Sequence, residues 1–170
     1  GGIRKQIEAG DITLDDIYSV HPFGNTMCVI RVTGQQVLDA LEWGARAVPS
    51  ENGGFLQVSG LTYEIHTGVA SSAEKDENGM FTRVSGEYRV KNVMVGGQPL
   101  ELDKTYTLAS HNYMLLGHGD GYTMFDGCEV LAEDMMVDNQ VLITYITTTL
   151  GGLVGEQYAN PYGDGRIVAV

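Results

Sequence analysis

The sequence has little positive charge and no long apolar run. Of its 170 residues, 10 are Lys or Arg and 22 are Asp or Glu, which gives a formal net charge of −12. Because a phosphate backbone requires a basic footprint, this balance argues against a nucleic-acid polymer as the partner, although a small anion needs only one or two donors. Since no run of 18 or more apolar residues is present, the sequence predicts no membrane-spanning helix.

Cysteine and proline are also scarce. Cys28 and Cys128 could form one disulfide in an exported protein, but two buried free thiols are the interpretation we favour. Only 4 prolines accompany a hydrophobic content of 43%, which is typical of a folded globular chain and not of a disordered one. A chain of this length suffices for one domain that buries about 70% of its unfolded surface.

Apolar periodicity and turn residues predict a mixture of helices and hairpins. The expected helices cover residues 3–10, 13–17 (capped by Thr13 with Asp16), 34–48 and 138–150 (capped by Asp138). The expected strands cover residues 26–32, 55–61, 62–66, 88–95, 105–110 and 166–170, with an exposed hairpin turn at Asn78-Gly79. Because these elements do not alternate as βαβ units, the sequence favours an α+β fold.

Two segments about ninety residues apart combine glycine with aromatic rings: His21-Pro22-Phe23-Gly24-Asn25 and residues 112–122, NYMLLGHGDGY. Glycine lets the backbone approach a ligand closely, and an aromatic face stacks on a nucleobase with about 1–3 kcal/mol. An aspartate accepts hydrogen bonds from a sugar diol. The pair therefore predicts a nucleoside-sized pocket. Two alternatives stay open: core packing of Phe23 and Tyr113, and an ordinary tight turn at residues 117–121.

The reactive side chains offer no convincing catalytic centre. The four histidines follow no metal-binding pattern, and His118-Gly119-Asp120 could at most mimic half of a metal site. Ser59 lacks the G-x-S-x-G context of a serine nucleophile. The glycine-rich segment 117–121 lacks the lysine of a phosphate-binding loop and contains an aspartate instead. We therefore expect substrate binding and not bond breaking.

An ordered series of motifs resembles the C-terminal domain of the 5′-nucleotidase family over nearly the full length. In chain order these are Gly1-Gly2-Ile3-Arg4, Gly10-Asp11-Ile12-Thr13, Pro22-Phe23-Gly24-Asn25, Gly54-Phe55-Leu56-Gln57-Val58-Ser59-Gly60-Leu61, Val95-Gly96-Gly97-Gln98-Pro99-Leu100, Asn112-Tyr113, Gly119-Asp120-Gly121-Tyr122 and Gly165-Arg166-Ile167. The resemblance implies one domain, residues 1–170, of the layered α/β/β/α type.

The resemblance also implies a division of labour between two domains. An N-terminal metallophosphoesterase domain, absent from these residues, would hold two divalent metal ions such as zinc or manganese and hydrolyse the phosphoric ester. The present domain would bind the nucleoside part of a nucleoside 5′-monophosphate. We therefore expect a segment of a longer hydrolase of nucleotide catabolism, secreted and located outside the cell, in the periplasm or at the cell surface. The segment alone, with no catalytic or metal-binding residue, should be inactive.

The family's binding residues carry over by position. Phe23 would supply one stacking ring, and Tyr113, which replaces a common phenylalanine, would supply the other. Asp120 would accept hydrogen bonds from the ribose hydroxyls. Arg4 would bind the substrate phosphate, and Asn25 would contact the edge of the base or support its loop.

Two departures from the family pattern and two alternative functions complete the prediction. The segment Met114–His118 is one residue longer than usual, and His118 replaces a usual glycine, so Tyr113 or Asp120 is expected to be aimed differently.

The same fold could instead serve hydrolysis of UDP-sugars, 2′,3′-cyclic nucleotides or thiosulfate. In a further alternative, the metal domain is degenerate and the protein is a non-catalytic surface binding module.

Overall fold

A three-stranded antiparallel sheet carries the two segments that were predicted to form the pocket. The computed structural model describes residues 2–160 and 163–170. Strand β1 (Met27–Thr33) is central and pairs with β7 (Thr105–His111) and β8 (Glu129–Ala132). In the register of β1 and β7, Met27 lies opposite His111. The first segment therefore enters β1 at the point where β7 leads into the second.

A second sheet has the strand order β6-β5-β2-β9, in which β2 (Leu61–Ile65) pairs antiparallel with β5 (Val90–Val95) and parallel with β9 (Ile167–Ala169). The short strand β6 (Gln98–Pro99) returns from β5 through Gly96 and Gly97, both with positive φ. Strands β3 (Ala73–Lys75) and β4 (Phe81–Val84) form the predicted hairpin, whose turn includes Gly79 at φ +81°.

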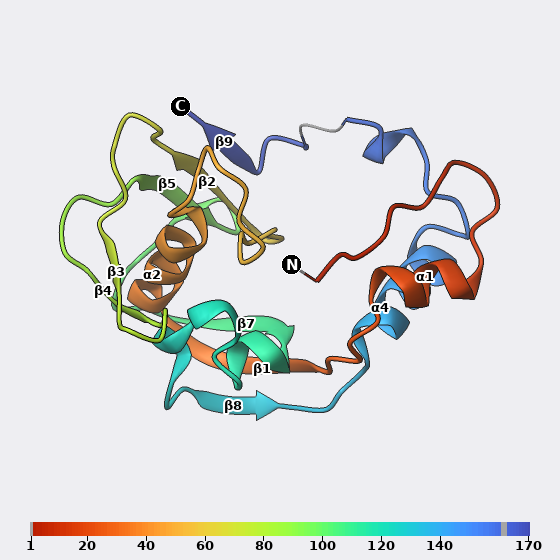
Figure 1. Cartoon of the computed structure of the whole chain (residues 1–170), viewed down its shortest axis with the longest axis horizontal. Coiled ribbons are helices and arrows are strands. Elements are labelled where there is room, and N and C mark those ends of the chain that lie inside the picture. The colour runs from red at the N-terminus through yellow and green to blue at the C-terminus, as the bar shows by residue number, and fades with distance from the viewer. Residues whose placement is uncertain (1, 161–162) are drawn as a thin grey trace.

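Helix α2 (Gly34–Ala45) lies between β2 and β5 on one side and β1 and β7 on the other (Figure 1). Thr33 and Gln36 form its capping box, in which each side chain accepts a hydrogen bond from the other residue's backbone N–H. Trp43, 1% exposed, lies in the hydrophobic core that α2 shares with the strands. The helix ends at Ala45, three residues earlier than expected, and turns lead on to Pro49.

Helices α1 (Leu14–Val20) and α4 (Asp138–Thr144) pack against each other beside the body of the domain (Figure 1). The predicted cap of α1 is confirmed, because Thr13 and Asp16 form a capping box. The chain also contains helix α3 (Asn112–Leu115), a π-helix at Tyr145–Thr149 and 3₁₀ turns at Gly119–Gly121, Thr123–Phe125 and Glu156–Tyr158. The mixed α and β composition in one domain confirms the predicted fold class.

The predicted helix over residues 3–10 is wrong. This segment is extended, Ile3 is 71% exposed, and the Arg4 N–H donates to the carbonyl oxygen of Val20 at 3.0 Å. A short helix is costly to nucleate, and the exposed Ile3 supplies no packing to offset that cost. The extended conformation places Arg4 beside the C-terminal end of α1.

Three further parts of the prediction differ from the structure. Residues 55–58 form no strand, because Phe55 closes a turn on Asn52 and Gly60 at φ +77° separates them from β2. Asp138 is the first residue of α4 and not its cap; its carboxylate accepts from the Asn139 N–H at 2.7 Å. The threonine-rich continuation of α4 is the π-helix, in keeping with the poor helix propensity of threonine.

Both cysteines are free thiols, with Cys28 buried and Cys128 half-buried. Burial raises the pKa of each thiol above its ordinary value. Among the residues that the structure describes, no helix is long and apolar enough to cross a membrane.

Candidate functional site

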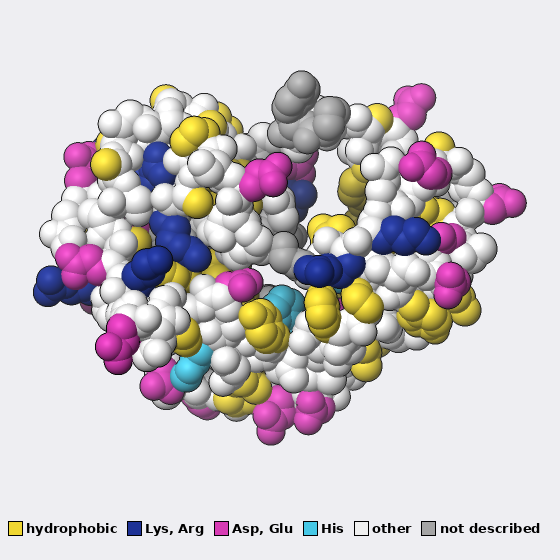
Figure 2. Space-filling model, in the orientation of Figure 1, with side chains coloured by type: hydrophobic (Ala, Val, Ile, Leu, Met, Phe, Trp, Pro, Cys, Tyr) yellow, Lys and Arg dark blue, Asp and Glu magenta, His cyan; other side chains and the backbone are white. Residues whose placement is uncertain are grey.

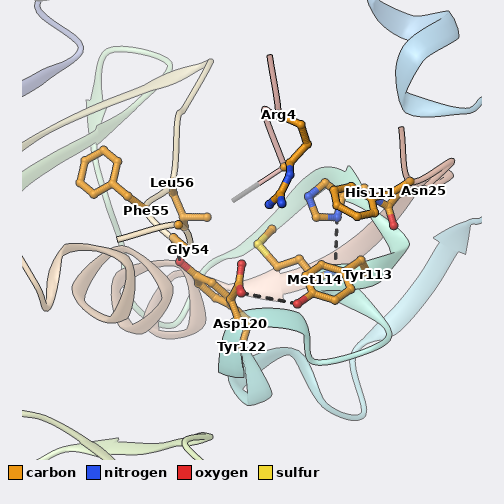
Figure 3. A pocket seen from close by; sticks show the side chains of 13 residues that line it. Arg4, Asn25, Gly54, Phe55, Leu56, His111, Tyr113, Met114, Asp120 and Tyr122 are labelled. Carbon is orange, nitrogen blue, oxygen red and sulfur yellow. Dashed lines mark hydrogen bonds between the residues drawn. The ribbon is translucent and has the colours of Figure 1, made fainter. Parts of the chain in front are cut away.

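All five residues predicted to bind substrate line one cavity of about 490 Å³. Figure 3 shows Arg4, Asn25, Tyr113 and Asp120 on its walls, and Phe23 also lines it. Figure 2 shows the face of the molecule hollowed between the α1 and α4 pair and the body of the domain. The structure thus brings together residues that are more than a hundred positions apart in the chain.

The side chain of Asn112 joins the two predicted segments. Its Oδ1 accepts hydrogen bonds from the backbone N–H groups of Thr26, at 3.1 Å, and Tyr113, at 2.9 Å. The Asn112 N–H in turn donates to the Thr26 carbonyl oxygen at 2.8 Å. Asn25 is held from the other side, since its Nδ2 donates to Asp138 at 3.4 Å. These bonds fix the loop of Phe23 and Asn25 against the start of α3.

The two aromatic rings are not part of the core. Phe23 is 58% exposed and Tyr113 is 48% exposed, so the core-packing alternative is wrong for both. The Arg4 guanidinium lies over the Phe23 ring, 5.6 Å from its centroid, a distance typical of a cation–π contact. Exposed aromatic faces in a cavity are suited to a flat ligand.

The turn that carries Asp120 is fixed on both sides. Trp43 Nε1 donates to the Asp120 carbonyl oxygen at 2.9 Å, and the Tyr113 hydroxyl donates to Asp120 Oδ1 at 3.4 Å. A Cβ at Gly119 would overlap the Tyr113 ring, and one at Gly121 would lie 2.8 Å from the Gly79 carbonyl oxygen. The flanking glycines therefore allow Tyr113 and Asp120 to face the same cavity.

A third segment, residues 53–56, also lines the cavity and was missed as part of the site. Gly54 is buried, and its carbonyl oxygen accepts a hydrogen bond from the hydroxyl of Tyr122. Burial raises the pKa of the Tyr122 phenol, which is therefore a neutral donor. The sequence signal was present, because Gly53-Gly54-Phe55 repeats the combination of glycine and aromatic residue seen in the two predicted segments.

His111 was missed as well. It lines this cavity and an adjoining one of about 590 Å³, and its ring centroid lies 5.9 Å from that of Tyr113. Burial is the main cause that lowers the pKa of His111 below its ordinary value, although the nearby Asp138 and Asp120 oppose this effect. The imidazole is therefore neutral at pH 7.

The described residues contain no group of three or more His, Cys, Asp or Glu side chains that could hold a metal ion. The family resemblance implies that the two metal ions are held by another domain, so it predicts no metal ligands among these residues. The cavity can contact a ligand through aromatic faces, one guanidinium, one carboxylate and neutral hydrogen-bonding groups.

Comparisons with known proteins agree with this fold. Residues 1–127 match the family model described as 5′-nucleotidase, C-terminal domain. The chain is 32% identical over 146 residues to a 5′-nucleotidase of Vibrio cholerae, covering 86% of this chain and 22% of that protein. It is 34% identical over 170 residues to the trifunctional nucleotide phosphoesterase protein YfkN of Bacillus subtilis, and the aligned region covers all of this chain and 10% of that protein. The chain thus spans a minor part of these curated relatives.

Solved structures show the same fold. The 5′-nucleotidase precursor of Thermus thermophilus aligns with a TM-score of 0.78 and 30% identity, over 99% of this chain and 30% of that one. The NAD nucleotidase of Haemophilus influenzae aligns with a TM-score of 0.67 at 23% identity, over 99% of this chain and 28% of that one, and supports the fold alone. The chain belongs to the family of 5′-nucleotidase C-terminal domains.

Proposed function

We propose that this domain recognises the nucleoside part of a small nucleotide for a metal-dependent phosphohydrolase of the 5′-nucleotidase type. The observation that carries the proposal is the convergence of Phe23, Tyr113, Asp120, Arg4 and Asn25 on one cavity. Names of relatives support the same substrate class, since several are called 5′-nucleotidases and one a nucleotide phosphoesterase.

Each residue has a role that suits its chemistry. Phe23 and Tyr113 present exposed faces on which a base can stack. Asp120 offers carboxylate oxygens to the ribose hydroxyls, which are hydrogen-bond donors. Arg4 supplies a positive charge for the phosphate. Asn25 carries an amide oxygen that can accept a hydrogen bond from the base, while its Nδ2 donates to Asp138.

Hydrolysis belongs, in this proposal, to a metallophosphoesterase domain outside these residues. The present domain would contribute by holding the substrate in line with the reacting groups, which can lower a barrier without any chemistry of its own. The intact protein would be an exported or cell-surface hydrolase. Residues 1–170 would be its C-terminal domain and would have no activity alone.

The contacts predict weak binding by the isolated domain. Two stacks contribute about 1–3 kcal/mol each, and hydrogen bonds to charged groups contribute about 1.5–3 kcal/mol each. These gains oppose an association cost of about 4–15 kcal/mol. We therefore expect a Kd for adenosine on the order of millimolar, which corresponds to about −4 kcal/mol.

Titration of adenosine into the ¹⁵N-labelled chain tests the proposal. We expect saturable NMR shifts in the wild type, centred on the cavity, and their loss in Phe23→Ala because one stacking face is removed. Tyr18→Ala is the matched control, since Tyr18 is a similarly exposed aromatic residue on α1 that does not line the cavity. Equal shifts in the wild type and Phe23→Ala would rule out Phe23 as a base contact. Saturation by adenosine would also argue against a thiosulfate enzyme.

A further inference from the structure

His111 lies between β7 and α3 and lines two adjoining cavities. It is the last residue of β7 and caps the N-terminus of α3, where its Nδ1 accepts a hydrogen bond from the Met114 N–H at 3.3 Å. The same side chain lines both the cavity of Tyr113 and the adjoining cavity of about 590 Å³. One edge of the imidazole is therefore occupied by the protein while the ring also faces open space.

The hydrogen bond to Met114 determines which ring nitrogen carries the proton. A nitrogen that accepts from a backbone N–H has its lone pair engaged, so the neutral ring carries its proton on Nε2. Figure 3 shows the second nitrogen of His111 on the side of the ring opposite the bond to Met114. The titratable groups that act on His111 are Asp138, Asp120 and His21, and burial outweighs them to keep it neutral. At the cavity wall His111 can therefore donate a hydrogen bond through Nε2–H, while its Nδ1 is already engaged with the Met114 N–H.

The neighbouring ring relates this donor to a bound base. The His111 and Tyr113 centroids are 5.9 Å apart and their planes are inclined by 34°. A flat heterocycle stacked on Tyr113 therefore has one edge beside His111. A neutral N–H donor favours a ring nitrogen or a carbonyl oxygen at that edge. It disfavours an amino group there, because the His111 N–H and the amino N–H would then face each other without an acceptor.

We propose that His111 Nε2–H donates a hydrogen bond to an acceptor atom on the edge of the nucleobase and thereby determines base preference. The inference rests on the proposed function, because it requires a base stacked on Tyr113. It adds a specificity-determining residue that none of the five predicted positions includes. In adenosine, the candidate acceptors are N1, N3 and N7.

Deaza analogues of adenosine, in which one ring nitrogen is replaced by C–H, test the proposal. The wild-type chain should bind one of the 1-, 3- and 7-deaza analogues about fivefold more weakly than adenosine, as expected for one neutral hydrogen bond. His111→Asn should bind adenosine about fivefold more weakly than the wild type and should no longer discriminate against that analogue. Asparagine is a good N-cap, so this variant keeps a partner for the Met114 N–H while its shorter side chain withdraws from the base.

Two results would overturn the role of His111. If His111→Asn binds adenosine and all three analogues as the wild type does, His111 only caps α3 and the inference fails. If His111→Asn binds weakly but retains the wild-type pattern among the analogues, the side chain acts by placing Tyr113, and the inference fails again. In both cases, loss of adenosine binding in Phe23→Ala shows that the proposed function holds and that only the inference about His111 fails. If Phe23→Ala also binds normally, the proposed function fails together with the inference.

Discussion

Replacing Gly119 by alanine should remove the Tyr113 stack without unfolding the domain. The added Cβ would overlap the Tyr113 ring at its Cδ1, Cε1 and Cζ atoms, so the ring must leave its place. Gly119 does not have a positive φ, and alanine therefore causes no backbone strain there. Because Tyr113 is 48% exposed, its ring can turn into solvent at little cost.

The magnitude follows from the stack that is lost. One base–aromatic stack contributes about 1–3 kcal/mol, so adenosine binding should weaken by about 5- to 150-fold. From a starting Kd on the order of millimolar, this change moves saturation in an NMR titration to a correspondingly higher adenosine concentration. The free energy of unfolding, measured with urea, should change by less than about 1 kcal/mol, since the displaced side chain contributes little to the core.

Two comparisons separate this effect from general disturbance. Gly68→Ala is the matched control, because a Cβ there meets no atom within 4 Å and its φ is not positive. A double-mutant cycle with Tyr113→Ala supplies the second comparison. Once the ring is absent, Gly119→Ala should cost nothing further. Additive losses in the double variant, or wild-type binding by Gly119→Ala, would refute the argument that Gly119 acts through Tyr113.

Two further predictions concern the core behind the site. Trp43→Phe removes the hydrogen bond from Nε1 to the Asp120 carbonyl oxygen and should lower the free energy of unfolding by about 1–3 kcal/mol, measured with urea; an unchanged value would show that the bond does not stabilise the turn. Glu42 is fully buried, with Oε2 accepting from the Val90 N–H at 2.9 Å, and burial raises its pKa. Because the folded state holds the proton more tightly than the unfolded state, Glu42 should favour folding below about pH 4.3, the pKa of an unfolded glutamate. That contribution should be lost as pH rises through the pKa of Glu42 in the folded state. The free energy of unfolding, measured with urea at a series of pH values from below to above the pKa of the unfolded state, should therefore fall less in Glu42→Gln than in the wild type. Equal pH dependence of the two proteins would contradict this prediction.

Local sequence signals were sufficient where a short-range rule decides the structure. The Thr13 and Asp16 capping box, the hairpin turn at Gly79 and the strands on either side of α2 all follow from residues close together in the chain. The five site residues also came together in one cavity. The two glycine and aromatic segments alone predicted a nucleoside-sized pocket, whereas the assignment of Arg4 and Asn25 to it depended on the family resemblance. From the residues alone, core packing of Phe23 and Tyr113 was also open, and only their exposure decides against it.

Long-range contacts account for what the sequence did not predict. The helix expected over residues 3–10 gives way to an extended segment whose Arg4 bonds to Val20, a pairing that no local pattern encodes. His111 was interpreted as one of four unconnected histidines, since its role as the cap of α3 becomes visible only with the fold. Gly54 was missed because the apolar residues after it resemble a strand, whereas its carbonyl oxygen bonds to Tyr122 far along the chain.

The family resemblance predicts that the loop before Asp120 is one residue longer than usual, and the structure shows the backbone conformation of this loop. His118, where the family resemblance predicts glycine, has φ +55°, a left-handed conformation that costs about 1–2 kcal/mol for a residue with a Cβ. This conformation explains why glycine is suited to the position. The loop nevertheless leaves Tyr113 and Asp120 on one cavity, because the Tyr113 ring is packed over Gly119 and Trp43 holds the Asp120 backbone. Asp120 itself has φ +54°, so a residue of the cavity wall shares the strain of this loop, and its backbone is held there by the hydrogen bond from Trp43.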